Sequence, residues 1–205
     1  VIGVGKTTLA RMLQPAFQAN LLLEVFEENP FLSNFYSDRA RYAFQTQIFF
    51  LLSRYHQQNR NVPGMISDGQ RLISDYTFEK DSLFASINLQ GDELEMYYRV
   101  HEALAEKIPS PNLIVYLRAS TETLMQRIAM RDRPYERQMD PDYIEMLNRA
   151  YDKSFLGEDR RVPVLVLDAN QIDFVRHPED LAFVENRIRQ SLLMAPFQPE
   201  LPISS

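Results

Sequence analysis

The chain has 205 residues, of which 45% are hydrophobic and 24% are charged, a balance typical of one globular domain and not of a disordered segment. Twenty-two basic residues against 28 acidic ones give a net charge of −6, which disfavours nucleic acid as the main partner. The chain has no cysteine for disulfides or thiolate chemistry, no apolar run long enough for a membrane span, and no secretory signal pattern at its start, so a cytoplasmic protein is expected.

The first half of the chain alternates between helical and extended patterns. A glycine-bearing turn opens it, and the residues that follow predict a helix over 8–17. The short apolar run at 21–25 predicts a buried strand, and regularly spaced apolar side chains predict a long helix over 35–58. Proline and glycine residues predict a loop over 59–69, and a second strand is expected over 71–75.

The second half continues this alternation. Asp92 and Glu95 form a capping-box pattern that predicts the start of a helix, and the continuous branched run at 113–117 predicts a buried strand. The remaining expected elements are helices over 121–130, from Asp140-Pro141 onward and over 177–193, and a last strand over 164–167.

Strands that are separated by helices predict a three-layer α/β domain, in which helices cover both faces of a parallel sheet of about five strands. We expect this domain to span 1–194, and the proline-rich residues 195–205 to form a loosely held tail.

The chain opens inside a chemical motif. Gly3-Val4-Gly5-Lys6-Thr7-Thr8 matches the second half of the phosphate-loop pattern G-x-x-x-x-G-K-[ST]. In such a loop the glycines let backbone N–H groups face phosphate oxygens, Lys6 would reach the β- and γ-phosphates of ATP, and Thr7 would hold Mg²⁺. The alternative is a glycine turn that only caps a helix, but the α/β pattern that follows favours the phosphate loop.

The first glycine of the motif would precede Val1. We therefore expect the first strand of the sheet to lie upstream of this chain, and the chain to be less stable without that strand.

Polar residues that could bind a second substrate follow. Glu24 ends the first predicted strand, and Tyr36, Gln47 and Arg54 lie on or near the long helix. Seven residues at ~100° each are nearly two whole turns, so Gln47 and Arg54 share one helix face. An amide beside a cation can recognise the edge of a nucleobase. Taken singly, each residue could also be a solvated acid, a packed aromatic or part of a polar helix face.

Together with the phosphate loop, Glu24, the segment 29–36 and the segment 44–54 resemble the deoxynucleoside kinase family, specifically its bacterial deoxyadenosine/deoxyguanosine kinase branch. The resemblance implies that Glu24 accepts the proton of the sugar 5′-hydroxyl. It also implies that Tyr36 contacts the 3′-hydroxyl and that Gln47, with Arg54 beyond it, reads the base.

The next match departs from the family at one position. The family carries an acidic-Arg-Ser triplet after the third strand, and Asp75-Tyr76-Thr77 stands here, so Tyr76 replaces the arginine. The resemblance implies that Asp75 arranges Mg²⁺ and that Asp81 contacts the base. Ile-Ser-Asp also occurs at 66–68; the copy at 73–75 is preferred because the family's Phe-Ala pair follows it, at 84–85. A plain helix cap is the alternative for Asp75.

Residues 127–136 closely resemble the family's arginine-rich lid. The resemblance implies that Arg127 packs near the nucleotide base, that Arg131 and Arg133 reach the phosphates, and that Glu136 touches the sugar on closure. Converging guanidinium groups stabilise a phosphoryl group in transit. A basic, solvated helix end is the alternative. After the last strand, Asp168 and Phe174 resemble the loop that holds the adenine of ATP.

Taken with these residues, the resemblance implies an ATP- and Mg²⁺-dependent kinase that converts a deoxynucleoside, with purines favoured, to its 5′-monophosphate in nucleotide salvage. The expected catalytic residues are Glu24, Lys6, Arg131 and Arg133. The expected partners are a deoxynucleoside and a nucleoside triphosphate, without nucleic acid or membrane, and the family implies a homodimer.

Two other functions stay open at this point. Another small phosphate-loop kinase, such as a nucleoside monophosphate kinase, would need a cationic clamp near the acceptor sugar, and the acceptor helix offers one suitably placed arginine. A catalytically silent nucleotide-binding relative would have lost Glu24 or Lys6, and both residues are present.

Overall fold

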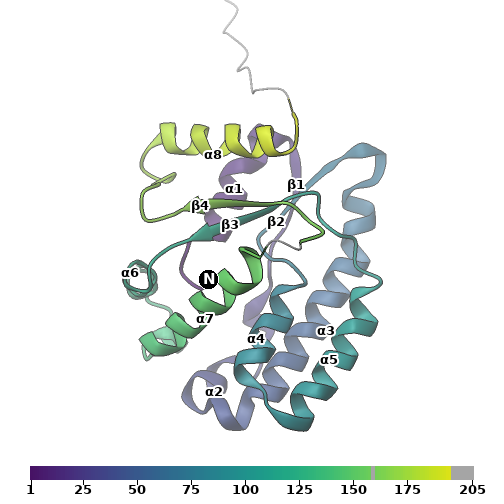
Figure 1. The fold of residues 1–205 in the computed structure, drawn as a ribbon, viewed down its shortest axis with the longest axis vertical. Helices are drawn as coiled ribbons and strands as arrows, with labels where there is room; N and C mark the ends of the chain where they lie inside the picture. Colours follow the sequence, from purple (N-terminus) through teal and green to yellow (C-terminus); the bar gives the residue numbers. More distant parts are fainter. Residues whose placement is uncertain (158–159, 195–205) are drawn as a thin grey trace, which may run out of the picture.

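The structure is a computed structural model that describes residues 1–157 and 160–194. Two parallel pairs of strands lie at its centre (Figure 1). The first pair is β1 (Ala19–Leu22) with β2 (Arg71–Ser74), and the second is β3 (Ile114–Arg118) with β4 (Val164–Asp168). No strand ladder joins the two pairs within the described residues. The tail expected at 195–205 lies outside these residues.

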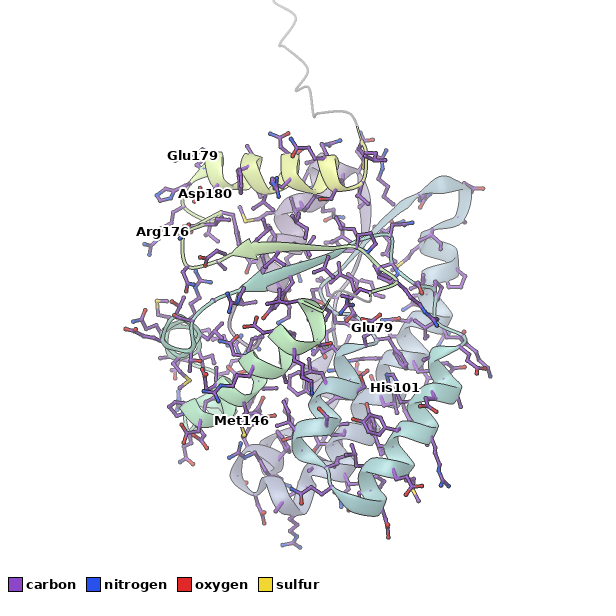
Figure 2. All side chains as sticks on the ribbon, in the orientation of Figure 1. Glu79, His101, Met146, Arg176, Glu179 and Asp180 are labelled. Atoms are coloured by element: carbon purple, nitrogen blue, oxygen red, sulfur yellow. The ribbon has the colours of Figure 1, made fainter. Side chains whose placement is uncertain are left out.

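Helices cover both faces of the strands, which confirms the three-layer α/β architecture. Figure 1 shows α1 and α8 on one side of the strands and α3, α4, α5 and α7 on the other. Side chains from these layers fill the space between helices and strands (Figure 2). The helices are α1 (Lys6–Phe17), α2 (Leu32–Ser37), α3 (Arg39–Met65), α4 (Lys80–Asn88), α5 (Gly91–Ala105), α6 (Thr121–Arg131), α7 (Pro141–Phe155) and α8 (Pro178–Ser191). None of them, over the residues described, has the length and apolar character of a membrane span.

Helix α7 shows how local sequence sets an element. The Asp140 side chain caps it by accepting a hydrogen bond from the Asp142 N–H, and Pro141 occupies the first turn, where no hydrogen-bond donor is needed. The helix then buries one face against the core, made of Tyr143, Ile144, Leu147, Tyr151 and Phe155. The predicted start of this helix is confirmed.

The expected loop over 59–69 is wrong for residues 59–65, which are helical, whereas residues 66–69 form a turn and a short 3-10 helix. Helix α3 continues to Met65 and includes Pro63. The single long helix predicted over 35–58 is in fact split at Asp38 into the end of α2 and the start of α3, and the Asp38 side chain caps α3. The helix continues because Val62 is buried against Leu22 and Tyr76, and this apolar packing outweighs the poor helix propensity of Pro63 in the last turn.

Two further predictions need correction. The first strand ends at Leu22 instead of residue 25, because the Glu24 N–H donates to the Asp75 carboxylate at 2.9 Å and not to a neighbouring strand. Asp92 is not a helix cap: α5 begins at Gly91, so Asp92 lies in its first turn, where a negative charge is favourable. Helix α4 was not predicted from the sequence.

Candidate active site

One cleft gathers most of the predicted site residues. It lies between the phosphate loop, the carboxyl ends of β1 and β2, helix α3 and the lid segment after α6. Parallel strands direct their carboxyl ends toward one edge, which is where such folds bind ligands. The predicted residues that line the cleft are Gly3, Lys6, Thr7, Glu24, Tyr36, Gln47, Arg54, Asp75, Arg131, Arg133 and Glu136.

The phosphate loop is held in a conformation that requires glycine. Gly3 and Gly5 have φ angles of 82° and 101°, which places both in the left-handed region. The loop leads directly into α1, whose N-terminal N–H groups favour an anion. Lys6 Nζ donates to the carbonyl oxygen of Val1 at 2.8 Å, so the lysine folds over the loop. Burial lowers the pKa of Lys6, while the nearby Glu24 and Asp75 carboxylates oppose that shift.

We predict that Gly3→Ala destabilises the protein more than Gly69→Ala does. A Cβ at Gly3 would lie 2.9 Å from Ile128 Cγ1 and 3.0 Å from the Leu124 carbonyl oxygen, whereas a Cβ at Gly69 meets nothing within 4 Å. Both glycines have positive φ, so Gly69→Ala isolates the backbone strain. Urea unfolding should show losses of about 3 kcal/mol and about 1 kcal/mol respectively. Equal losses would mean that the loop is not packed tightly against α6.

A hydroxyl and a carboxylate meet beside the loop. Thr7 Oγ1 donates to Asp75 Oδ2 at 2.5 Å, and the other Asp75 oxygen accepts from the Glu24 N–H. This contact supports the copy of Ile-Ser-Asp at 73–75, because Asp68, in the other copy, adjoins the opposite end of β2. Oxygen ligands of this kind suit Mg²⁺.

Glu24 is surrounded by cations. Its carboxylate accepts from Arg54 Nε at 2.8 Å and from Lys80 Nζ at 2.7 Å, and Arg54 also pairs with the fully buried Asp81. Burial disfavours the charged carboxylate, but Arg54 and Lys80 together outweigh it and hold the pKa of Glu24 well below its usual range. Glu24 is therefore ionised at neutral pH and available to accept a hydrogen bond from a hydroxyl group.

The far end of the cleft has the character of a nucleoside pocket. Gln47 is only 2% exposed, it lines the cleft, and no described residue forms a hydrogen bond with its amide. Tyr36 stacks on Tyr135 with ring centroids 6.0 Å apart. An unpaired buried amide is costly, so a ligand that pairs with it binds selectively. The apolar wall, which the sequence did not reveal, consists of Leu32, Phe35, Phe50, Phe84 and Tyr151.

The predicted lid arginines converge on one acid. Arg131 donates to both carboxylate oxygens of Glu136 at 2.6 Å, and Arg133 lies 3.8 Å from the same carboxylate. The Arg133 guanidinium also stacks over the Phe26 ring at 4.3 Å. Both arginines line the cleft.

Of the predicted adenine residues, Arg127 and Phe174 lie beside the phosphate loop and Asp168 lies at the end of β4; none of the three lines the cleft. Arg127 donates to the carbonyl oxygens of Val4 at 3.2 Å and Ala169 at 2.8 Å, which ties the loop to the turn after β4. The Phe174 ring lies 3.2 Å from the position that a Cβ on Gly5 would take. Asp168 accepts hydrogen bonds from the backbone and side chain of Asn170.

Lys80 is the main polar residue that sequence reasoning missed. It faces Glu24 across 56 residues of sequence, and it begins a helix that the pattern did not reveal. Burial lowers the pKa of Lys80 to about 8 although Glu24 opposes this shift, so the amine is mostly charged at pH 7. Tyr76, in the place of the family arginine, donates to Gln57 Oε1 at 2.6 Å and does not line the cleft.

Comparison with known proteins gives consistent findings. A family model described as deoxynucleoside kinase matches residues 1–193. The chain is 34% identical over 195 residues to a deoxyguanosine kinase of Bacillus subtilis (strain 168), covering 94% of each protein. It is 32% identical over 187 residues to a deoxyadenosine kinase of Dictyostelium discoideum, covering 89% of this chain and 74% of that protein.

A solved structure shares the fold. The structure of deoxyadenosine kinase from M. mycoides with the products dCMP and a flexible dCDP bound matches with a TM-score of 0.81 at 24% identity. The match covers 93% of this chain and 96% of that one. The three-layer α/β domain therefore has the fold of a phosphate-loop kinase.

Proposed function

Because this chain belongs to the deoxynucleoside kinase family, we propose that its cleft transfers the γ-phosphoryl group of ATP to the 5′-hydroxyl of a purine deoxynucleoside. One observation carries the proposal: Glu24 and the Thr7–Asp75 pair adjoin each other, joined by the hydrogen bond from the Glu24 N–H to Asp75. An acceptor hydroxyl beside Glu24 would thus lie next to the phosphates on the loop. The product is a deoxynucleoside 5′-monophosphate, as in nucleotide salvage.

In this proposal, the acidic residue acts on the acceptor hydroxyl and the basic residues act on the transferring phosphoryl group. The Glu24 carboxylate orients the 5′-hydroxyl and takes its proton as the oxygen bonds to the γ-phosphorus and the bond to ADP breaks. Lys6, Arg131 and Arg133 neutralise the charge that spreads over the transferring group. If Arg131 and Arg133 released Glu136 and bound phosphate instead, the lid would close and exclude water. ATP would then not be hydrolysed.

We propose Thr7 and Asp75 as the residues that hold Mg²⁺ with ATP, since Mg²⁺ prefers one or two carboxylates, a hydroxyl and substrate phosphates. When bound, the ion would neutralise phosphate charge. Arg127 and Phe174 are proposed on the donor side because they adjoin the phosphate loop, and Asp168 because the residue after it, Ala169, accepts a hydrogen bond from Arg127. We also propose a single kinase domain over 1–194 and a cytoplasmic homodimer. The apolar side chains that α3 and α5 expose, Leu52 and Met96, support the dimer.

The acceptor base is proposed to be adenine or guanine, read by Gln47 with Arg54 and Asp81 behind it. The relatives described above as deoxyguanosine and deoxyadenosine kinases support this choice. Deoxycytidine is the alternative, because the M. mycoides deoxyadenosine kinase structure holds dCMP as a product.

Steady-state kinetics with the four deoxynucleosides test the proposal. We expect kcat/KM for deoxyadenosine or deoxyguanosine to exceed the pyrimidine values, and Gln47→Ala to lower the purine value about 100-fold, mainly through KM, because a bidentate base contact is lost. Gln190→Ala, at an exposed position of α8, is the control. A pyrimidine preference in the wild type, or an unchanged KM in Gln47→Ala, would contradict the proposed base recognition.

A further inference from the structure

Lys80 is a buried cation to which no role has been assigned so far. Its Nζ lies 2.7 Å from Glu24 Oε2 and 3.1 Å from Oε1, so it contacts both oxygens of the proposed base. Its side chain is 11% exposed, and it lines the cleft together with Lys6 and Thr7. It therefore faces the place where the acceptor hydroxyl and the phosphates would meet.

The surroundings of Lys80 fix its position. Lys80 is the first residue of α4, and its ammonium lies 5.5 Å from the ring centroid of Phe84, one turn further along. The preceding Phe78 stacks on His101 of α5 at 4.9 Å. Glu79 turns away and pairs with Arg160 at 2.8 Å (Glu79 and His101 are labelled in Figure 2). Asp81, the residue after Lys80, pairs with Arg54, so both acids beside Lys80 in sequence have another cation as partner and Lys80 itself pairs with Glu24.

The charge balance of the cluster also depends on Lys80. Arg54 pairs with both Glu24 and the fully buried Asp81, so one guanidinium serves two carboxylates. Lys80 supplies the second positive charge. Without it, the charges of Glu24, Arg54 and Asp81 would leave one negative charge of this buried cluster unbalanced, and Glu24 would share its remaining cation with Asp81.

In the family pattern, an arginine directly follows the acid that corresponds to Asp75. This chain has no cation at that position. Tyr76 occupies that position, its hydroxyl donates to Gln57, and its ring packs against Leu22 and Val62. The cation beside the base comes from Lys80 instead.

We propose that Lys80 is a positioning residue for phosphoryl transfer, which holds the Glu24 carboxylate against the acceptor hydroxyl and supplies the positive charge missing at position 76. This inference rests on the proposed role of Glu24 as the base. A residue that acts through Glu24 should matter only while Glu24 is present.

The test compares Lys80→Met, Lys80→Arg and the double variant Glu24→Gln/Lys80→Met with wild type, with kcat expressed per ATP-binding site so that unfolded protein does not count. Lys80→Met should lower kcat about 100-fold with KM for ATP little changed, and Lys80→Arg should recover most of the loss. The double variant should be no more than about threefold slower than Glu24→Gln alone, because coupled residues are non-additive. Lys107→Met, exposed at the end of α5, is the matched control.

A kcat for Lys80→Met within threefold of the Lys107→Met value, or losses that multiply in the double variant, would overturn the role of Lys80. If Lys80→Met does not fold, Lys80→Gln, which keeps a polar end, decides by the same criteria. Failure of the wild type to phosphorylate any deoxynucleoside would instead refute the proposed function, before any variant is compared.

Discussion

Replacing Glu24 with glutamine should lower kcat about 1,000-fold, because the amide keeps the shape of the carboxylate but cannot take the proton of the 5′-hydroxyl. The carboxylate is ionised under all ordinary conditions, since Arg54 and Lys80 hold its pKa well below the usual range against the effect of burial. Its proposed contribution is to orient the hydroxyl and receive the proton as the phosphoryl group transfers. Initial rates at saturating ATP and deoxynucleoside measure the effect.

The same variant leaves Arg54 and Lys80 short of a negative partner, so part of any loss could come from instability. Thermal melting and ATP binding of the variant separate the two effects. Glu93→Gln, exposed in the first turn of α5, controls for the loss of one negative charge. A folded, ATP-binding Glu24→Gln that keeps more than a tenth of wild-type kcat would contradict the assignment of Glu24 as the base.

The second large effect is expected at the phosphate loop. Lys6→Met should lower kcat/KM for ATP about 1,000-fold, because the lysine is the loop's own cation for the β- and γ-phosphates. Its ammonium donates a hydrogen bond to the Val1 carbonyl oxygen, and it would exchange that partner for phosphate.

Lys153→Met, exposed near the end of α7, is the matched control for Lys6→Met. The melting temperature of Lys6→Met should change little, since burial disfavours the charged form of Lys6. A reduction of kcat/KM for ATP smaller than tenfold would show that the loop lysine does not serve the triphosphate.

Features of the fold that depend on residues adjacent in sequence could be predicted from the sequence. Asp140 and Pro141 mark the start of α7, and the glycine pattern at 3–8 marks the phosphate loop. The end of α3 could not be predicted in this way. Local propensity at Pro63 indicates a break, whereas the burial of Val62 against Leu22 and Tyr76 depends on segments far away in the chain.

The same distinction applies to the cleft. Gln47 and Arg54 share a helix face by spacing alone, so their shared location was predictable. The pairing of Glu24 with Lys80, 56 residues apart, depends on how the segment after β1 meets the start of an unpredicted helix. That Arg54 would pair with Glu24 as well as Asp81 was equally hidden, because a sequence shows the charges but not which of them share one buried cluster.

The central claim is that this cleft transfers phosphate from ATP to the 5′-hydroxyl of a deoxynucleoside, and product stoichiometry tests it most directly. Wild-type protein with ATP, Mg²⁺ and deoxyadenosine or deoxyguanosine should form ADP and the 5′-monophosphate in equal amounts. With 2′,5′-dideoxyadenosine, which lacks the acceptor oxygen, it should form neither above background. ADP released at the same rate with and without an acceptor, or a phosphorylated product from the 5′-deoxy analogue, would contradict the claim.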